Sequence, residues 1–325
     1  MKAIILAAGY GTRLFPITIN RPKSLLKING KPLINFTIEN LEKINDLDNI
    51  YIVTNKLFLN DFLAWKETLN CKKQIDIICN DTNKPDEKFT SMMNALLVIK
   101  QKNINDDCII TASDGVCSLD TPQLVKQFYE TNNSYVTIYD ISKNLKLKAV
   151  GSVILDAAGN ITEFIEKPNE IKSSKASIAF NIFTKNDLKK IEEYVNENHS
   201  GDAPGYFLEW LYKKSVLKTF ELNGTWFDIA NNDQFLSANI QLSNKNLTTE
   251  PNVGWETSLA LGKNYISEYA FIKNSILENC YIFENTIIKN SRLTNCVIGP
   301  DSKISSIQLS SSTLGPKTII NGEQF

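Results

Sequence analysis

The sequence predicts an α/β fold with a mostly parallel, Rossmann-like sheet, followed by a short parallel β-helix built of hexapeptide-like repeats. Two observations carry this prediction. Up to about residue 140, short apolar runs alternate with amphipathic helical segments, which is typical of a parallel sheet covered on both faces. After about residue 257, small residues recur every five or six positions, each followed closely by an aliphatic residue.

The elements of the α/β part follow from the period of its apolar residues. Strands are expected at residues 2–7, 49–54, 75–78, 107–113 and 134–140. The helices expected among them lie at 33–44, 58–69, 89–101 and 121–132. Beyond residue 145 the pattern is mixed, with strands at 147–155, 161–166 and 176–183, and helices at 185–197, 205–214 and 231–243.

A glycine-containing turn and two cationic side chains directly follow the first expected strand. Gly9 and Gly11 let the backbone turn sharply and bring its N–H groups close to an anion, and Arg13 and Lys23 supply positive charge. The spacing differs from the GxGxxG of dinucleotide-binding folds and from the GxxxxGK[ST] of P-loops, so neither standard fingerprint applies. Ligands of parallel sheets bind beyond the carboxyl ends of the strands, where this turn lies. The stretch therefore indicates nucleotide chemistry.

This stretch resembles, nearly residue for residue, the opening motif G-x-G-T-R-L-x-P-x-T…P-K-x-L of the nucleotidyltransferases that make activated sugars. The matching residues are Gly9, Gly11, Thr12, Arg13, Leu14, Pro16, Thr18, Pro22, Lys23 and Leu25. The resemblance implies transfer of a nucleotidyl group from an NTP to a sugar 1-phosphate, with release of pyrophosphate. We expect the nucleotide to be bound by Leu6, Ala7, Ala8, Gly9, Gly11, Thr12, Arg13 and Ser91.

Two acidic residues are candidates for a metal site. Asp114 follows the strand expected at 107–113, although an Asp-Gly pair is also an ordinary turn signal. Asp228, in the sequence WFDIA, resembles the family's W-x-D-I-G segment. The resemblance implies that these two carboxylates hold Mg²⁺, which prefers hard oxygen ligands and takes its remaining ligands from water and the triphosphate. With Arg13 and Lys23 they form the expected catalytic set.

The sugar side of the expected site is marked by the sequence EKP at residues 166–168. The resemblance implies that Lys167 meets the sugar phosphate and that Glu166 meets a sugar hydroxyl. In the next strand the family's Asn-x-Gly is replaced by Ser177 and Ala179, and Ala230 stands where a glycine normally follows the metal-binding aspartate. We expect Ser177 to bind the substrate and the extra methyl groups to narrow the pocket.

The nucleobase stays open, because Thr90, Ser91 and Asn94 replace the glutamine and G-x-A turn usual in thymidylyl- and uridylyl-transferring relatives. This version looks somewhat like the cytidylyl-transferring branch. One alternative is therefore a cytidylyltransferase acting on a phosphorylated alcohol such as phosphocholine. Another is a catalytically silent regulatory subunit that senses nucleotide sugars. Activity is favoured because the full charged set is present, namely Arg13, Lys23, Asp114, Lys167 and Asp228.

The C-terminal repeat resembles the hexapeptide repeat of left-handed parallel β-helices. Its small residues are Ser275, Cys280, Thr286, Ser291, Cys296 and Ser302, and about three coils are expected. We expect a nucleotidyltransferase domain at 1–245, a linker at about 244–257 and a β-helix domain at 246–325. Hexapeptide acyltransferases use a histidine base, and no histidine lies between residues 246 and 325. The β-helix is therefore interpreted as a structural or homo-oligomerisation element.

Composition excludes several other classes of protein. The formal net charge of the 325 residues is −1 and charges of both signs are interspersed, so no nucleic-acid partner is expected. No targeting segment or membrane-length apolar run is apparent, which predicts a cytoplasmic protein without a membrane partner. The single histidine, His199, disfavours histidine-based zinc sites and Ser-His-Asp triads. Of the three arginines, Arg13 is interpreted as a phosphate ligand and Arg21 as a solvated side chain.

Overall fold

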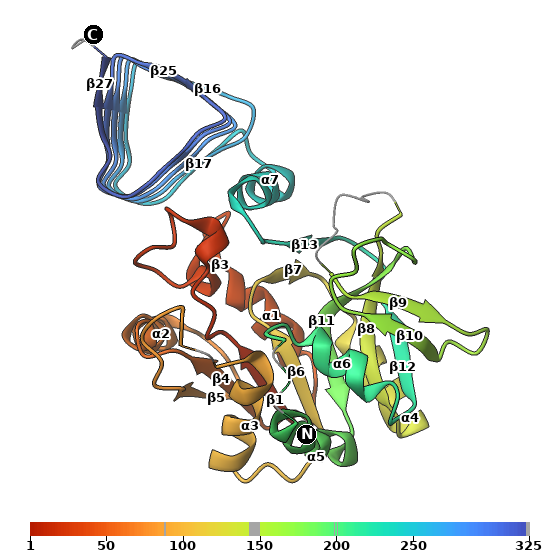
Figure 1. Ribbon diagram of the computed structural model, residues 1–325. Coiled ribbons are helices and arrows are strands. Elements are labelled where there is room, and N and C mark those ends of the chain that lie inside the picture. Colours follow the sequence, from red (N-terminus) through yellow and green to blue (C-terminus); the bar gives the residue numbers. More distant parts are fainter. Residues whose placement is uncertain (88, 143–149, 198, 200, 323–325) are drawn as a thin grey trace. The chain divides into compact units, whose positions relative to one another are not determined.

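The computed structural model describes residues 1–87, 89–142, 150–197, 199 and 201–322 (Figure 1). The chain divides into two compact units. Unit 1 comprises Met1–Gly9 and Ile34–Trp226, and unit 2 comprises Tyr10–Leu33 and Phe227–Phe325. The chain thus passes from unit 1 to unit 2 inside the motif that the sequence singles out.

Unit 1 is built on a mixed sheet, which has nine strands in the part of the chain described. The strands are β1 Lys2–Leu6, β4 Asn49–Thr54, β5 Gln74–Cys79, β6 Cys108–Ala112, β8 Ser134–Asp140, β9 Ser152–Leu155, β10 Ile161–Ile165, β11 Lys175–Phe183 and β12 Leu217–Glu221. Their order is β10-β9-β11-β6-β1-β4-β5, and β8 pairs with β11 and β12. Strands β6, β1, β4 and β5 are parallel to one another, whereas β11 runs antiparallel to β6. The predicted mostly parallel sheet is confirmed.

Helices cover the sheet on both faces. They are α1 Leu33–Glu42, α2 Leu59–Thr68, α3 Ser91–Gln101, α4 Thr121–Thr131, α5 Lys185–Asn196 and α6 Gly205–Leu211. Apolar residues of α3, α5 and α6 form one core with Ile4 of β1 and Ile110 of β6. Side chains alternate along a strand, so Ala3 and Ile5 face the opposite side, where both are fully buried. The expected elements agree with these bounds to within a few residues.

Two differences from the expected elements have physical reasons. Strand β12 was not expected, because its sequence LKTFE carries two charged residues and reads as exposed loop. It lies at an edge of the sheet, paired with β8, where charged side chains remain solvated. The strand expected at 147–155 is observed from Ser152, and residues 147–149 lie outside the described residues.

Unit 2 combines the segment 10–33, one helix and a stack of short strands. The segment holds two 3₁₀ turns, Thr12–Leu14 and Lys23–Leu25, and a hairpin of β2 Lys27–Ile28 with β3 Lys31–Pro32. We call residues 10–33 the motif loop. Strand β13, Trp226–Asp228, leads into helix α7, Asn232–Leu242.

The short strands form the predicted left-handed β-helix, seen as a triangular coil in Figure 1. They are β14 Leu247–Thr249, β15 Gly254–Glu256, β16 Leu259–Leu261, β17 Asn264–Ile266, β18 Phe271–Lys273, β19 Ile276–Glu278, β20 Tyr281–Ile282, β21 Ile287–Lys289, β22 Arg292–Thr294, β23 Val297–Ile298, β24 Lys303–Ser305, β25 Gln308–Ser310, β26 Thr313–Leu314 and β27 Ile319–Asn321. Within the described residues these make parallel sheets of five, five and four strands. The stack is therefore nearly five coils high rather than the expected three.

The first strands of the coil lie in the segment 244–257, whose composition predicts a linker. Strands β14 and β15, within residues 244–257, pair with β17 and β18. A division of the chain near residue 245 stays a prediction. Asn252 adopts a φ of 62°, and Pro251, Glu256 and Thr257 are exposed, so composition alone did not distinguish this segment from a linker.

The interior of the coil confirms the predicted repeat. All six small residues are at most 6% exposed. Hydroxyls join neighbouring coils: Ser275 Oγ accepts from the Ser291 N–H at 3.1 Å, and Ser291 Oγ accepts from Ile307 N–H at 3.3 Å. At the corners, asparagines adopt positive φ angles of 48–55°, which this residue tolerates better than most. They are Asn274, Asn279, Asn285, Asn290 and Asn295.

Helices long and apolar enough to cross a membrane are absent from the residues described.

Candidate functional site

The first part of the glycine turn belongs to unit 1 and leaves the sheet along a fixed path. The Ala7 N–H donates to the carbonyl of Val53 in β4 at 2.9 Å. The side chain of Asn55, fully buried just after β4, donates to the Ala8 carbonyl at 3.0 Å and accepts from the Phe58 N–H at 3.0 Å. These bonds hold Leu6–Gly9 at the carboxyl edge of the sheet. Sequence reasoning missed Asn55, although a polar residue directly after a buried strand was a usable signal.

Asp114 lies at the same edge of unit 1 as Ala8. Leu6 of β1 is in register with Ala112 of β6, and the two strands are parallel. The residues that follow each strand, Ala7–Gly9 and Ser113–Asp114, therefore leave the sheet side by side. Asp114 is half-buried. This edge is where ligands of parallel α/β sheets bind.

Unit 1 also brings together three residues predicted to contact substrates, around the start of α6. The N–H and hydroxyl of Ser91 both donate to the carbonyl of Asp202, three residues before α6. A Cβ built on Gly205, the first residue of α6, would overlap the carboxylate of Glu166. Ser91 and Glu166 thus flank the same short segment.

Ser177 joins this group through Gly151. Its N–H donates to the Gly151 carbonyl at 2.8 Å, and a Cβ on Gly151 would lie 2.9 Å from Glu166 Oε2. Both glycines leave room for the carboxylate, which explains why side chains are absent at these two positions. Ser91, Glu166 and Ser177 therefore line one region of unit 1.

The electrostatics of this region centre on Glu166. Burial raises the pKa of Glu166 to about 7; the neighbouring Lys167 lowers that pKa and the carboxylate of Glu209 raises it. The Glu166 N–H donates to Glu209 Oε2 at 3.2 Å. With a pKa raised to about 7, the carboxyl of Glu166 exchanges its proton near neutral pH: the protonated form can donate a hydrogen bond to a hydroxyl group, and the ionised form can accept one.

Lys167 reaches solvent from a backbone that is itself constrained. Its φ is 50°, in the left-handed region that few residues adopt. The ammonium lies 5.6 Å from the ring centroid of Tyr206 in α6, within the range of a cation–π contact. The side chain of Lys167 is exposed to solvent, and its ammonium lies over the Tyr206 ring of α6.

The strand that carries Ser177 has a bulge at the position where the family's motif has glycine. Strand β11 loses register with β8 between Ser177 and Asn181, and Ala179 there has a φ of 54°. A left-handed conformation costs an alanine about 1–2 kcal/mol. The backbone therefore retains the conformation that suits a glycine although the glycine itself is absent.

The polar residues of the expected base-reading segment are engaged with one another. Thr90 caps α3 by accepting from the Met93 N–H at 3.3 Å. Asn94 is only 5% exposed; its oxygen accepts from Asn80 at 2.8 Å and its amide donates to the Thr90 carbonyl at 3.1 Å. These side chains hold the start of α3 in place, together with the bond from Ser91 to Asp202.

The second part of the motif, in unit 2, is folded tightly around Gly11. Gly11 has a φ of 66°, and the Thr18 hydroxyl donates to its carbonyl at 2.8 Å. A Cβ on Gly11 would lie 3.2 Å from Cβ of Lys23, so both conformation and space require glycine. Lys23 is 7% exposed, whereas Thr12 and Arg13 are exposed. Lys23 thus stands directly behind the turn that presents Arg13.

Asp228 belongs to the same unit as Arg13 and Lys23. It ends β13, and α7 begins four residues later, capped by Asn231, which accepts from the Gln234 N–H at 2.9 Å. The amide of Asn232, the first residue of α7, donates to the Phe15 carbonyl of the motif loop at 3.1 Å. Helix α7 therefore connects the segment that carries Asp228 with the segment that carries Arg13.

The residues expected to hold a metal ion are both carboxylates. Among the residues that the structure describes, no three His, Cys, Asp or Glu side chains gather as metal ligands. Asp114 and Asp228 offer two half-buried carboxylates. Asp114 belongs to unit 1 and Asp228 to unit 2. Each is a hard oxygen donor of the kind that Mg²⁺ prefers, an ion that keeps several waters and binds substrate phosphates.

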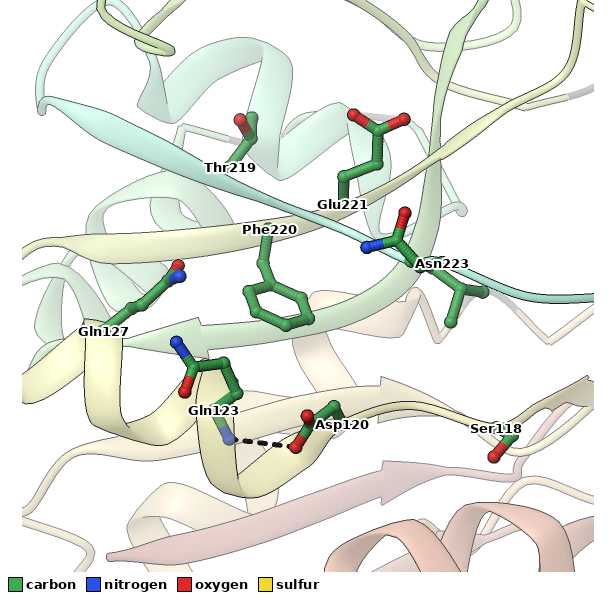
Figure 2. Close-up of a pocket in the computed structure, with 9 residues that line it drawn as sticks. Ser118, Asp120, Gln123, Gln127, Thr219, Phe220, Glu221 and Asn223 are labelled. Atoms are coloured by element: carbon green, nitrogen blue, oxygen red, sulfur yellow. Dashed lines mark hydrogen bonds between the residues drawn. The ribbon is translucent and has the colours of Figure 1, made fainter.

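A cavity of about 490 Å³ lies elsewhere in unit 1, between α4 and β12. Gln123 and Gln127 of α4 and Phe220 of β12 line this cavity (Figure 2). Its acidic lining residues are Asp120, which accepts from the Gln123 N–H at 3.2 Å, and Glu221. The lining is without a cation and without any of the predicted site residues, so it is unsuited to a triphosphate.

The fold and the motif define a class of protein. In unit 1, the carboxyl edge of the parallel strands carries the start of a glycine turn and an aspartate, which is typical of nucleotide-binding α/β proteins. Residues 2–245 match the family model described as Nucleotidyl transferase. The chain belongs to this nucleotidyl transferase family.

The chain is similar to several curated proteins. The chain is 32% identical over 289 residues to a bifunctional sugar-1-phosphate nucleotidylyltransferase/acetyltransferase of Sulfurisphaera tokodaii, covering 84% of this chain and 64% of that protein. It is 31% identical over 251 residues to the bifunctional protein GlmU of Methanococcus vannielii, covering 74% and 54%. It is 27% identical over 238 residues to the mannose-1-phosphate guanylyltransferase catalytic subunit beta of Xenopus tropicalis, covering 73% and 63%. The chain therefore spans between half and two thirds of the length of these relatives.

Solved structures agree on the fold. A protein from Bacillus anthracis assigned as a glucose-1-phosphate thymidylyltransferase superposes with a TM-score of 0.65 at 25% identity, covering 76% of this chain and 96% of that one. A UDP-glucose pyrophosphorylase superposes with a TM-score of 0.60 at 22% identity, covering 73% and 96%.

Proposed function

We propose that this chain transfers a nucleotidyl group from an NTP to a sugar 1-phosphate, releasing pyrophosphate. Membership of the nucleotidyl transferase family supports this reaction. The observation that carries it is the conformation of the motif loop. Gly11 is left-handed and packed against Lys23, while Arg13 is exposed beside it. A left-handed glycine turn that carries an exposed arginine suits the oxygens of a polyphosphate, which backbone N–H groups and a guanidinium can bind.

The reaction needs no general base from the protein. A sugar 1-phosphate, with a second pKa of about 6, is mostly a dianion at neutral pH and can attack the α-phosphorus directly. A bond forms between a phosphate oxygen of the sugar and that phosphorus, and the bond to the β-phosphate breaks as pyrophosphate takes the electron pair. His199 fits this account, because its ring is stacked on Tyr194 at 4.4 Å and bonded to Glu197 at 2.8 Å.

The proposed catalytic groups act by neutralising charge. Arg13 and Lys23 would stabilise the negative charge that gathers on the phosphates in the transition state. Asp114 and Asp228 would hold Mg²⁺, which when bound supplies further neutralisation of phosphate charge. Leu6–Gly9, Gly11, Thr12 and Ser91 would bind the nucleotide.

On the sugar side, Lys167 would hold the incoming phosphate in line, while Glu166 and Ser177 contact the sugar. Burial raises the pKa of Glu166 to about 7, and such a carboxyl suits a hydroxyl ligand. The relatives' names cover guanylyl and thymidylyl transfer, so the base and the sugar are left to experiment.

The test is pyrophosphate release with Mg²⁺ across four nucleoside triphosphates and a panel of sugar 1-phosphates, with phosphocholine as a further acceptor. We expect one NTP and one sugar phosphate to be strongly preferred. Release with phosphocholine alone would replace the sugar by a phosphorylated alcohol. Silence with every pair, in folded protein, would contradict the proposal and favour a regulatory subunit.

A further inference from the structure

We propose that the β-helix positions the motif loop for nucleotide binding, with Glu284 and Glu250 as its positioning residues. We call the two ion pairs Arg21–Glu284 and Lys27–Glu250 the clamp. The inference rests on the proposed function, because it assigns the clamp a role in binding the NTP. All of its contacts lie inside unit 2.

The first half of the clamp is a fork between Arg21 and Glu284. Arg21 donates from Nη2 to Glu284 Oε1 at 2.6 Å and from Nη1 to Oε2 at 3.5 Å. The guanidinium also lies 4.9 Å from the ring centroid of buried Phe283. Two parallel hydrogen bonds plus stacking fix the planar group in one orientation. The expectation that Arg21 is simply solvated is therefore wrong: it is 30% exposed and paired with the β-helix.

The second half of the clamp holds the hairpin that ends the motif loop. Lys27 Nζ lies 2.6 Å from Glu250 Oε1, an acid only 13% exposed. The same carboxylate accepts from the Tyr265 hydroxyl at 2.6 Å and from the Glu268 N–H at 3.1 Å. Although burial raises the pKa of Glu250, these hydrogen bonds keep it below its ordinary value. The acid is thus an ionised, fixed anchor rather than a loose surface charge.

A third contact is steric. A Cβ built on Gly315, in a late coil, would lie 3.0 Å from Cβ of Pro16. The motif loop is consequently held at Pro16, Arg21 and Lys27 along its length. Arg13 and Lys23 each lie within four residues of one of these anchor points.

Isolated surface ion pairs contribute little to stability, so the role of these two pairs depends on their geometry. Here each pair joins residues more than 200 positions apart in the chain, 263 for Arg21–Glu284 and 223 for Lys27–Glu250. One member of each pair has a further partner: Arg21 stacks on Phe283, and Glu250 accepts a hydrogen bond from Tyr265. A loop held in its binding conformation loses less entropy when a ligand docks.

The test compares Glu284→Gln and Glu250→Gln with a matched control, Glu256→Gln, in the full chain. Glu256 pairs with Lys273 at 2.8 Å within the β-helix, so the control removes a similar ion pair away from the motif loop. Amide hydrogen exchange of residues 10–33 is measured without ligand. The KM for NTP and kcat are measured separately, and thermal unfolding checks the fold.

We expect both clamp variants to raise amide exchange in the motif loop and the KM for NTP by about fivefold to tenfold, with a smaller change in kcat. The thermal midpoint should lie about 2–4 °C below that of Glu256→Gln, because Glu250 and Glu284 are less exposed than Glu256. Arg21→Lys keeps the charge but loses the fork and stacking, so its effect should be intermediate. Exchanging the pair, as Arg21→Glu with Glu284→Arg, should recover part of the loss.

Exchange and KM values in both clamp variants equal to those of Glu256→Gln would overturn the inference. If either clamp variant unfolds, the folded Arg21→Lys protein decides by the same two measurements. Failure of the proposed function looks different, because the wild-type chain would then show no turnover. Hydrogen exchange would still decide whether the clamp holds the loop, and binding of inorganic pyrophosphate would decide whether the loop takes phosphates.

Discussion

The Thr18 hydroxyl donates a 2.8 Å hydrogen bond to the carbonyl of Gly11, and this bond closes the turn that presents Arg13. Thr18 is fully buried. We predict that Thr18→Val, which keeps the shape and loses the donor, costs about 1 kcal/mol of unfolding free energy and raises the KM for NTP. Chemical denaturation and steady-state kinetics measure the two effects. An unchanged KM would show that the bond does not shape the nucleotide site.

Gly11 has a matched control elsewhere in the chain. Gly11→Ala imposes a side chain at a φ of 66° with Lys23 Cβ at 3.2 Å, whereas Gly159→Ala imposes one at a φ of 76° with nothing within 4 Å. Both variants should lose about 1 kcal/mol of stability from backbone strain. Only Gly11→Ala should lower kcat/KM, by at least about tenfold, since crowding displaces the turn. Equal activity losses in the two variants would contradict a role for the turn.

The left-handed Ala179 predicts a stabilising substitution. Ala179→Gly removes the strain at a φ of 54° and should raise the unfolding free energy by about 0.5–1 kcal/mol. Ala176, in the same strand, does not have a positive φ, so Ala176→Gly should lower the unfolding free energy. Thermal unfolding of both variants is the measurement. A loss of stability in Ala179→Gly would mean that the methyl group packs more favourably than the backbone strain costs.

The buried carboxyl of Glu166 makes stability depend on pH. Burial raises its pKa in the folded chain to about 7, above the value of about 4.3 expected when unfolded. The folded state therefore binds the proton more tightly, and its stability falls as pH rises from about 4.5 to 7. After allowance for partial exposure we expect about 2 kcal/mol. Glu166→Gln should remove this slope; an identical slope in wild type and variant would assign it to other groups.

Substituting the two aspartates of the proposed metal site should reduce turnover without reducing stability, unlike substituting a structural acid. We predict that Asp114→Asn and Asp228→Asn lower turnover at least about a thousandfold while leaving thermal unfolding nearly unchanged. The control is Asp120→Asn, which alters the carboxylate that caps α4 and should keep most activity. Loss of folding in both Asp114 and Asp228 variants would show that these acids are structural.

Much of the fold could be predicted because its signals are local. Apolar runs and helical periodicity placed β1, β4, β6 and the helices of unit 1 to within a few residues. The extent of the β-helix could not be predicted, because its first coil uses polar residues at corners. The asparagine that precedes most of the small residues was an unused signal for those corners.

The candidate site was predictable only where a residue acts through its type and position in a motif. Gly11 and Ala179 both have the positive φ that is expected where the family's motif has glycine. The pairing of Arg21 with Glu284 and the bond from Asn55 to Ala8 join residues 263 and 47 positions apart, which no local pattern encodes. Oligomerisation through the β-helix stays a prediction.

The most direct test of the central claim follows the phosphorus atoms of the preferred NTP. With a label on the α-phosphate, we predict that the label appears in a nucleoside diphosphate sugar and that unlabelled pyrophosphate is released in equal amount. Label released as free nucleoside monophosphate, or transfer of the γ-phosphate to the acceptor, would contradict the account.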